Sequence, residues 1–324
     1  MTIEHTVDGA PAPVTLAFEP VDCCICGNKE AEPVAVGEDF EYRTSDDSFL
    51  AVRCERCSLV YLDPRPTEAE LPRIYPDSYH AFDFSAEEFG LVHRVRSRLE
   101  ARRLLKACGD LPAGARVLDV GCGDGFHLDL LRRYGPEGWR LEGVDLDERA
   151  VARARERGLE VHHGTIEALG LDADTYDMAF MIQTIEHVAD PPGVLAAVRR
   201  VLRPGGRLMI VTDNTRSIDS RLFRSRVWGG YHFPRHWNLF DKPSMRRLAA
   251  KVGFEVAELG TMVSPVNWVY SVRNTLDDLG APRWAVEQFS LATPATLGVF
   301  TIVDGVTTAV GRGALLRVIL RKPA

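Results

Sequence analysis

Apolar residues gather in short runs along most of the chain, and between these runs they recur at helical spacing. Short apolar runs bounded by turn residues predict buried strands, and apolar positions three and four apart predict helices. Strands are predicted at residues 116–120, 141–145, 159–163, 177–182 and 207–211. Helices are predicted at residues 91–108, 126–131, 147–158, 192–202 and 239–253. Because strands alternate with helices, we expect a doubly wound α/β fold with a mainly parallel, Rossmann-like sheet.

The N-terminal part carries a different pattern, set by cysteines. Cys23 and Cys26 form one C-x2-C pair, and Cys54 and Cys57 form a second pair after 27 residues. Two such pairs present four thiolates to one tetrahedral zinc ion. Four sulfur ligands leave no open coordination position, so we predict a structural zinc rather than a catalytic one. Short strands predicted at residues 41–43, 48–52 and 59–62 complete a small zinc ribbon.

Charge divides the chain in the same place. The net charge is −7, but residues 1–90 carry 19 acidic and only six basic side chains. We therefore predict a flexible N-terminus at residues 1–20, a zinc ribbon at 21–80 and an α/β domain at 81–324. An acidic ribbon repels polyanions, so we expect no nucleic acid partner. No apolar run has the length of a membrane span and no secretory signal is present, so we expect a cytoplasmic protein with no transmembrane segment.

A glycine-rich loop follows the first predicted strand of the α/β domain. Gly121, Gly123 and Gly125 stand between this strand and a helix, and Asp119 ends the strand. Glycines let the backbone approach a ligand closely, and the neighbouring acidic residues favour a ligand with a positive amino acid end over a diphosphate. Asp145 ends the second strand, where an acidic side chain typically binds ribose hydroxyl groups. The loop therefore predicts a nucleoside site.

Four segments in this order, VLDVGCGDG, GVDLD, YDMAFMIQTIEHVADP and VLRPGGRLMIVTDN, resemble the class I S-adenosylmethionine-dependent methyltransferases. The resemblance covers about residues 90–260 and implies a seven-stranded sheet with S-adenosylmethionine as cofactor. It implies that Asp119 and Gly121 face the methionine end of the cofactor and that Asp145 binds the ribose. It places Ile166 against adenine and Gln183 beside the sulfonium. The chain also resembles bacterial methyltransferases that carry an N-terminal zinc ribbon and methylate nucleotide-linked sugars or other small metabolites.

The last two strands of the sheet are predicted at residues 254–259 and 315–321. About fifty residues, 261–313, are inserted between them and contain two predicted helices at 266–279 and 297–310. A long insertion beside an acceptor site is typical of a lid or of a dimer surface, so a homodimer is one expectation. A lipid-linked acceptor is the alternative left open.

The segment after the fifth strand carries the candidate acceptor chemistry. Residues 213–247 hold eight basic and three acidic side chains, and arginines are suited to anion recognition. A carbon or oxygen acceptor needs a general base. The candidates, in order of preference, are His232, His236 and Tyr231, of which Tyr231 and His232 resemble the Tyr/His region of sugar methyltransferases. We therefore predict C- or O-methylation of a small anionic acceptor, such as a nucleotide-linked sugar or a secondary metabolite.

Three alternatives accompany this prediction. In some quinone O-methyltransferases a Glu-x-x-Glu-His cluster binds a divalent metal, but Gln183 replaces the first Glu here, and we favour a packing role for Glu186 and His187. A second alternative is a ribosomal RNA methyltransferase that reads RNA with its zinc ribbon, which the acidic ribbon disfavours. A third is a catalytically idle scaffold that only binds the cofactor, which the intact glycine loop disfavours.

Overall fold

The computed structural model describes residues 15–76, 79 and 86–324, and for residues 86–96 it describes the backbone only. Most of the predicted flexible segment, residues 1–20, lies outside the described residues. Its last part does not fit the prediction, because β1 (Phe18–Glu19) pairs antiparallel with β5 (Arg65–Pro66).

A seven-stranded sheet in the order β12-β13-β10-β9-β6-β7-β8 forms the centre of the larger domain. Its strands are β6 (Arg116–Val120), β7 (Arg140–Asp145), β8 (Glu160–His163), β9 (Tyr176–Ile182), β10 (Leu202–Asp213), β12 (Glu255–Met262) and β13 (Leu315–Arg321). Five neighbouring strands run parallel, and β13 pairs antiparallel with both β10 and β12. The predicted doubly wound α/β sheet is confirmed, and the carboxyl ends of its parallel strands meet at one edge.

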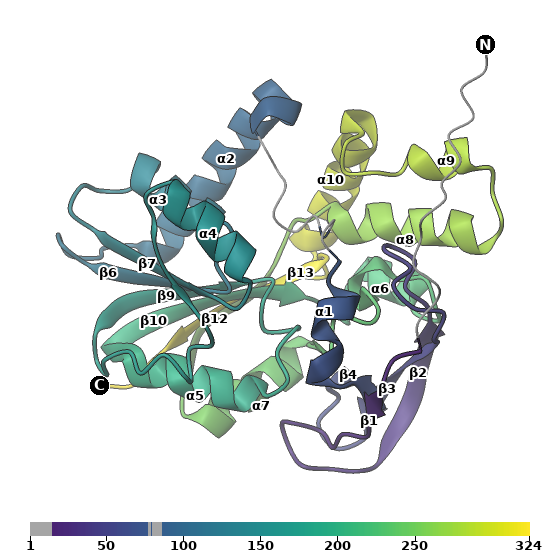
Figure 1. Cartoon of the computed structure of the whole chain (residues 1–324), viewed down its shortest axis with the longest axis horizontal. Helices are drawn as coiled ribbons and strands as arrows, with labels where there is room; N and C mark the ends of the chain where they lie inside the picture. The colour runs from purple at the N-terminus through teal and green to yellow at the C-terminus, as the bar shows by residue number, and fades with distance from the viewer. Residues whose placement is uncertain (1–14, 77–78, 80–85) are drawn as a thin grey trace.

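Helices cover both faces of this sheet (Figure 1). One face carries α2 (Ala86–Cys108), α3 (Phe126–Tyr134) and α4 (Glu148–Glu156), and the other carries α5 (Pro191–Val201) and α7 (Lys242–Val252). Their apolar faces bury side chains such as Leu104, Leu131, Leu195 and Leu248 against the strands. Burial of each such side chain stabilises the fold by about 1.5–3 kcal/mol.

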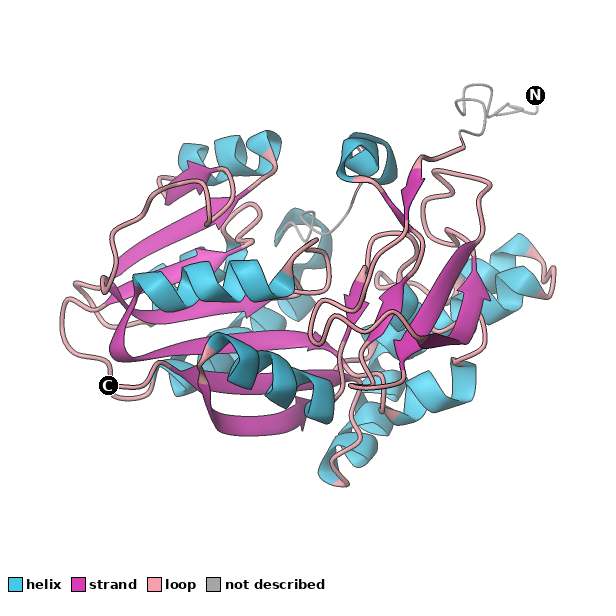
Figure 2. Cartoon of the chain, turned by 90° about the horizontal axis from the view of Figure 1, so that it is seen from below, coloured by secondary structure: helices cyan, strands magenta, loops and turns pink. Residues whose placement is uncertain are grey.

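The N-terminal ribbon is built on a smaller antiparallel sheet, which lies beside the carboxyl edge of the large one (Figure 2). Its order is β11-β4-β3-β2, with β2 (Ala31–Gly37), β3 (Phe49–Cys54), β4 (Val60–Leu62) and β11 (Asn238–Leu239). Strand β11 belongs to the segment that follows β10, so the larger domain completes the ribbon sheet. After β5 the chain forms a 3-10 turn (Glu68–Glu70) and the short helix α1 (Leu71–Ile74).

The prediction of a strand at residues 41–43 is wrong. The residues form a turn, because the carboxylate of Asp39 accepts hydrogen bonds from the backbone N–H groups of Tyr42 and Thr44. Asp side chains commonly fold the backbone back in this way. Arg43 adopts a positive φ of 50° within the turn.

The insertion between β12 and β13 is helical, as predicted. It contains α8 (Val266–Asp278), α9 (Arg283–Glu287) and α10 (Pro294–Ala309), and α6 (Ile218–Phe223) and a 3-10 turn (Gly229–Tyr231) precede it. Helix α10 exposes apolar side chains that include Ile302 and Val306. None of the helices that the structure describes is both long enough and apolar enough to cross a membrane.

Candidate active site

The glycine loop lies between β6 and α3, at the carboxyl edge of the sheet. Gly121, Gly123 and Gly125 all have a positive φ. A Cβ atom at Gly121 would lie 2.4 Å from Oγ1 of Thr184, so only glycine fits between the loop and the segment after β9. Asp119 is 1% exposed, and neither of its carboxylate oxygens has a hydrogen-bond partner among the described residues. A buried carboxylate that accepts no hydrogen bond from the described residues, with only the ring nitrogen Nδ1 of His127 at 3.6 Å, fits a cationic group on a ligand.

Asp145 ends the neighbouring strand β7 and is tied to the same loop. Its Oδ2 accepts a hydrogen bond of 2.7 Å from the N–H of Gly123, and its Oδ1 accepts one of 2.8 Å from the N–H of Asp147. Each carboxylate oxygen keeps a second lone pair for a ligand hydroxyl. Burial raises the pKa of this half-buried carboxyl above its usual value.

The two remaining cofactor candidates occupy different environments. Ile166 is 2% exposed and packs in the main apolar core. Gln183 is exposed, has a positive φ of 51° and follows β9 directly. Its Nε2 lies 3.5 Å from Oδ2 of Asp213, at the end of β10. The segment after β9 therefore connects the glycine loop to the end of the next strand.

Three histidine rings cluster beside Asp213, at the boundary between the sheet and the ribbon. The ring centroids of His187 and His236 are 4.6 Å apart, and those of His232 and His236 are 4.9 Å apart. Nδ1 of His236 lies 2.9 Å from the carbonyl oxygen of Gly230 and 3.4 Å from Oδ2 of Asp213. Burial raises the pKa of Asp213 to about 7 and lowers the pKa of His236 well below its usual value.

His232 contacts a carboxylate from the ribbon. Its Nδ1 lies 2.7 Å from Oε2 of Glu41, and both side chains are mostly buried. Burial opposes ionisation of Glu41, but His232 and Arg235 hold the pKa of this carboxyl below its usual value. When Nδ1–H of His232 donates a hydrogen bond to an anionic Glu41, the imidazole keeps a lone pair on Nε2. This nitrogen can then take a proton from a substrate.

His187 and Glu186, which we expected only to pack the turn, also border the cluster. The hydroxyl of Tyr75 lies 2.8 Å from Nδ1 of His187, and Thr212 donates a hydrogen bond to Glu186. One ligand atom each from Glu186, His187 and His236 lies within 4.8 Å of the others. Burial raises the pKa of Glu186 and lowers that of His187 to about 3, so it favours the neutral form of each side chain.

The hydroxyl of Tyr231 is bound outside the histidine cluster. Its hydroxyl donates a hydrogen bond to the backbone carbonyl of Arg224, and its ring stacks on Phe233 with centroids 4.9 Å apart. The side chain belongs to the apolar core between the ribbon and α6. The structure thus brings together His232 and His236 but not Tyr231.

Sequence patterns did not single out Glu41 for the site. Glu41 precedes His232 by 191 positions, so no local spacing connects the two residues, and the predicted strand at residues 41–43 gave it no role in the site. Only the turn that Asp39 forms directs the segment toward the histidines. Aromatic residues are dense in the stretch that follows the ribbon, and two of them, Tyr75 and Tyr79, lie against this cluster. Phe82 and Phe84 of the same stretch lie outside the described residues.

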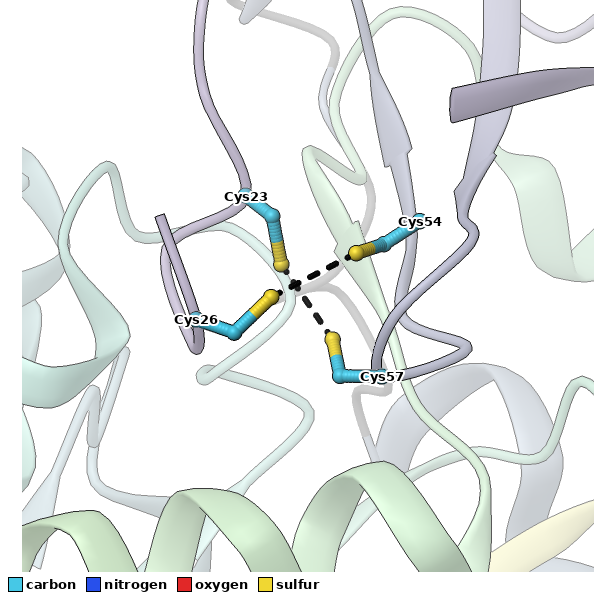
Figure 3. A group of neighbouring side chains, drawn as sticks. All are labelled: Cys23, Cys26, Cys54 and Cys57. Carbon is cyan, nitrogen blue, oxygen red and sulfur yellow. Dashed lines mark hydrogen bonds between the residues drawn. The ribbon is translucent and has the colours of Figure 1, made fainter. Parts of the chain in front are cut away.

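The four predicted zinc ligands converge (Figure 3). The Sγ atoms of Cys23 and Cys57 are 3.3 Å apart, those of Cys26 and Cys54 are 3.5 Å apart, and all four lie within 4.8 Å of one another. A zinc ion with sulfur ligands at about 2.3 Å separates them by about 3.8 Å, so the group fits a tetrahedral structural zinc. Cys24 stays outside it, with its thiol 3.5 Å from Oδ1 of Asn238.

The arginines predicted to recognise an anion are divided. Arg226 pairs with Glu38 and Asp278, at 2.7 and 2.9 Å, near the ribbon surface. Arg216, Arg221 and Arg224 line a separate pocket beside α6. Arg224 and Arg226 therefore lie in different surroundings, although a single residue separates them in the sequence.

Comparisons with known proteins agree with this geometry. A family model described as "Methyltransferase domain" matches residues 91–259, just over half of the chain. The chain is 35% identical over 181 residues to the ubiquinone biosynthesis O-methyltransferase of Aromatoleum aromaticum, an alignment that covers 51% of this chain and 75% of that protein. The corresponding protein of Marinobacter nauticus is 33% identical over 184 residues, covering 51% and 74%.

Among solved structures, geranyl diphosphate C-methyltransferase from Streptomyces coelicolor, in complex with Mg²⁺, geranyl diphosphate and S-adenosyl-L-homocysteine, has a TM-score of 0.50. The match covers 74% of this chain and 83% of that one at 16% identity, so it shows a shared fold alone. The assignment of this chain to a family rests on the extent of the family match and on the identity to the ubiquinone biosynthesis O-methyltransferases. The chain belongs to the class I S-adenosylmethionine-dependent methyltransferases.

Proposed function

We propose that the protein transfers a methyl group to carbon or oxygen of a small anionic acceptor, such as a nucleotide-linked sugar or a secondary metabolite, with His232 as the general base. The observation that carries this proposal is the 2.7 Å contact between His232 and Glu41 at the carboxyl edge of the sheet. The ring of His232 packs against His236, whose Nδ1 lies 3.4 Å from Oδ2 of Asp213, and Asp213 in turn lies 3.5 Å from Nε2 of Gln183.

The residues at this edge fit S-adenosylmethionine. The buried carboxylate of Asp119, which accepts no hydrogen bond among the described residues, is suited to the amino group of its methionine part, and Gly121, Gly123 and Gly125 give room for close approach of the backbone. Asp145 would hold the ribose, Ile166 would border the adenine and Gln183 would flank the sulfonium. When bound, the cofactor supplies the electrophilic methyl group.

His232 is better placed for base catalysis than His236. Glu41 fixes the Nδ1 proton of His232 and stabilises the imidazolium that forms when Nε2 takes a proton from the acceptor. Nδ1 of His236 instead lies nearest a backbone carbonyl, at 2.9 Å, with Oδ2 of Asp213 farther away at 3.4 Å, and burial disfavours its cationic form. Glu41 acts through His232 and is therefore a positioning residue, which the zinc ribbon contributes to the active site.

Substitution of His232 tests the proposal. His232→Ala should lower kcat by about 10²- to 10⁴-fold with the affinity for S-adenosylhomocysteine unchanged. Glu41→Gln should lower kcat less and displace the pH dependence of kcat/KM, because the imidazolium loses its anionic partner. Tyr231→Phe, which removes only a hydroxyl bound to a backbone carbonyl, is the matched control. Near-normal turnover of His232→Ala over a panel of nucleotide-linked sugars and phenolic acceptors would reject His232 as the base.

A further inference from the structure

A pocket of about 490 Å³ opens on the side of the ribbon that faces α6. Four separate parts of the chain contribute to its wall: the ribbon sheet, the segment around α6, the start of α7 and the turn before β13. Neither the zinc group nor the histidine cluster accounts for this pocket, since none of the four cysteines and none of the three histidines lines it.

The lining of the pocket is strongly basic. It contains six cationic side chains and a single carboxylate, that of Asp241. The cationic residues are Arg53, Arg216, Arg221, Arg224, Lys242 and Arg312. The carboxylate of Asp241 is already engaged, because it accepts hydrogen bonds from Nε of Arg216 and from the N–H of Ser244. It therefore neutralises one of the six charges.

Three of the guanidinium groups have no counter-charge in the part of the chain that the structure describes. Among the described residues, no carboxylate pairs with Arg221, Arg224 or Arg312, and all three residues are exposed. Arg226, only two residues beyond Arg224, shows the contrast, because it pairs with both Glu38 and Asp278. Arg226 has two carboxylate partners, whereas the three arginines at the pocket have none among the described residues. The pocket therefore carries a positive potential that favours an anion.

The hydrogen-bond donors that line the pocket favour phosphoryl oxygens. Guanidinium groups bind phosphate through paired hydrogen bonds, and the three unpaired arginines have these donors available. Lys242 and Pro243 form the first turn of the eleven-residue helix α7, whose amino end adds partial positive charge. The apolar side chains of Val34 and Val60 also line the pocket.

The pocket also borders the candidate active site. Trp228 and Tyr231, both nearly fully buried, line it on one side and line a small cavity beside Glu41 and His232 on the other. Asn214, at the pocket wall, directly follows Asp213 at the histidine cluster. A ligand in the pocket would contact the same aromatic wall that supports the His232 segment.

From these observations we infer that the pocket binds the phosphoryl groups of a phosphorylated small molecule, chiefly through Arg221 and Arg224. The inference concerns the phosphoryl group itself and stands apart from the proposal for His232. That group belongs either to a distal part of the methyl acceptor or to a second small molecule, and a methyl-transfer competition assay separates the two sources.

Isothermal titration of the full chain with inorganic pyrophosphate, and separately with uridine diphosphate, at low ionic strength tests the inference. We expect binding that weakens with added salt. The double variant Arg221→Ala/Arg224→Ala should weaken it by about tenfold or more, because two charged hydrogen-bond donors are removed. Arg226→Ala is the matched control, since its guanidinium is already neutralised outside the pocket, and its Kd should stay within about twofold.

Unchanged S-adenosylhomocysteine affinity and thermal unfolding show that the variants are folded. Absence of pyrophosphate and uridine diphosphate binding to the wild type, or equal weakening in Arg226→Ala, would overturn the inference. Where both ligands bind, a methyl-transfer assay identifies the source. Competition between pyrophosphate and the acceptor assigns the phosphoryl group to the acceptor, and simultaneous binding assigns it to a second molecule.

Discussion

Asp39 of the ribbon and Arg235 of the segment after β10 form an ion pair in which neither side chain is exposed. Two parallel hydrogen bonds of 3.0 and 2.9 Å join the guanidinium to the carboxylate. The guanidinium carbon lies 4.4 Å from the ring centroid of Tyr42, whose N–H also binds Asp39. One carboxylate thus shapes the turn that carries Glu41 and anchors it near His232.

Asp39→Ala should destabilise the protein by about 3–5 kcal/mol, because it leaves the Arg235 charge buried without a partner. Burial opposes ionisation of Asp39, yet Arg235 lowers its pKa to about 2, so the pair is intact at neutral pH. Urea denaturation measures the loss. Glu32→Ala, which breaks an exposed pair with Arg53 at 3.4 Å, is the control and should change stability by less than about 1 kcal/mol. Similar losses in both variants would contradict a special role for the buried pair.

Zinc content gives a second prediction. The purified protein should contain one zinc ion per chain, and Cys57→Ser should lose it and unfold at a lower temperature, because the metal joins the two knuckles of the ribbon. Turnover should fall with it, since the ribbon holds Glu41 at His232. Metal analysis and thermal unfolding test this. Cys24→Ser should keep the zinc, because its thiol lies outside the four-sulfur group; equal zinc loss in both variants would refute the assignment.

Most of the fold could be predicted because it follows from local pattern. The apolar runs that form β6, β9 and β13 are bounded by turn residues, and burial on both faces leaves them largely hydrophobic. The prediction of a strand at residues 41–43 was wrong because of a local side-chain interaction. A side-chain carboxylate at Asp39 satisfies the backbone N–H groups that a strand would pair with its neighbour.

The active site could be predicted only for residues that lie close together in the sequence at a characteristic spacing. The glycine loop and Asp145 could be identified from their spacing along the chain, and the N–H of Gly123 does donate a hydrogen bond to Asp145. The contact between Glu41 and His232 depends instead on how the ribbon docks. That docking rests on long-range interactions, such as the pairing of Asn238 with Tyr61, which no local pattern encodes.

Asp213 makes the stability of the protein depend on pH. Burial raises its pKa to about 7 in the folded chain, against about 3.9 for an unfolded Asp. The folded state therefore holds this proton more tightly, and the stabilisation is full below about pH 4 and lost as the pH rises through about 7. Asp213→Asn cannot titrate, so it should gain about 2–3 kcal/mol relative to wild type between pH 5 and pH 8.

Urea denaturation at pH 5, 6, 7 and 8 measures this difference. Asp46→Asn, at an exposed position, is the control and should follow the wild type at every pH. If the curves for wild type and Asp213→Asn stay parallel, Asp213 is already ionised at pH 5 and the expected linkage is absent.

Gly121 should be indispensable for cofactor binding for a steric reason. A Cβ atom at this position would lie 2.4 Å from Oγ1 and 2.5 Å from Cγ2 of Thr184, so Gly121→Ala must displace Thr184 and the adjoining Gln183. Both residues border the site at which we place S-adenosylmethionine. We therefore expect the affinity for S-adenosylhomocysteine to fall by about tenfold or more, measured by calorimetry.

Gly114 provides a control that separates this collision from backbone strain. Its φ is 79°, close to the 75° of Gly121, but apart from its two chain neighbours no residue has an atom within 4 Å of the position that a Cβ atom would take there. Gly114→Ala should therefore cost a similar strain of about 1 kcal/mol in stability and leave cofactor affinity unchanged. A loss of affinity in Gly121→Ala alone identifies close approach at the loop as the cause. Equal affinity in the two variants would place the cofactor elsewhere.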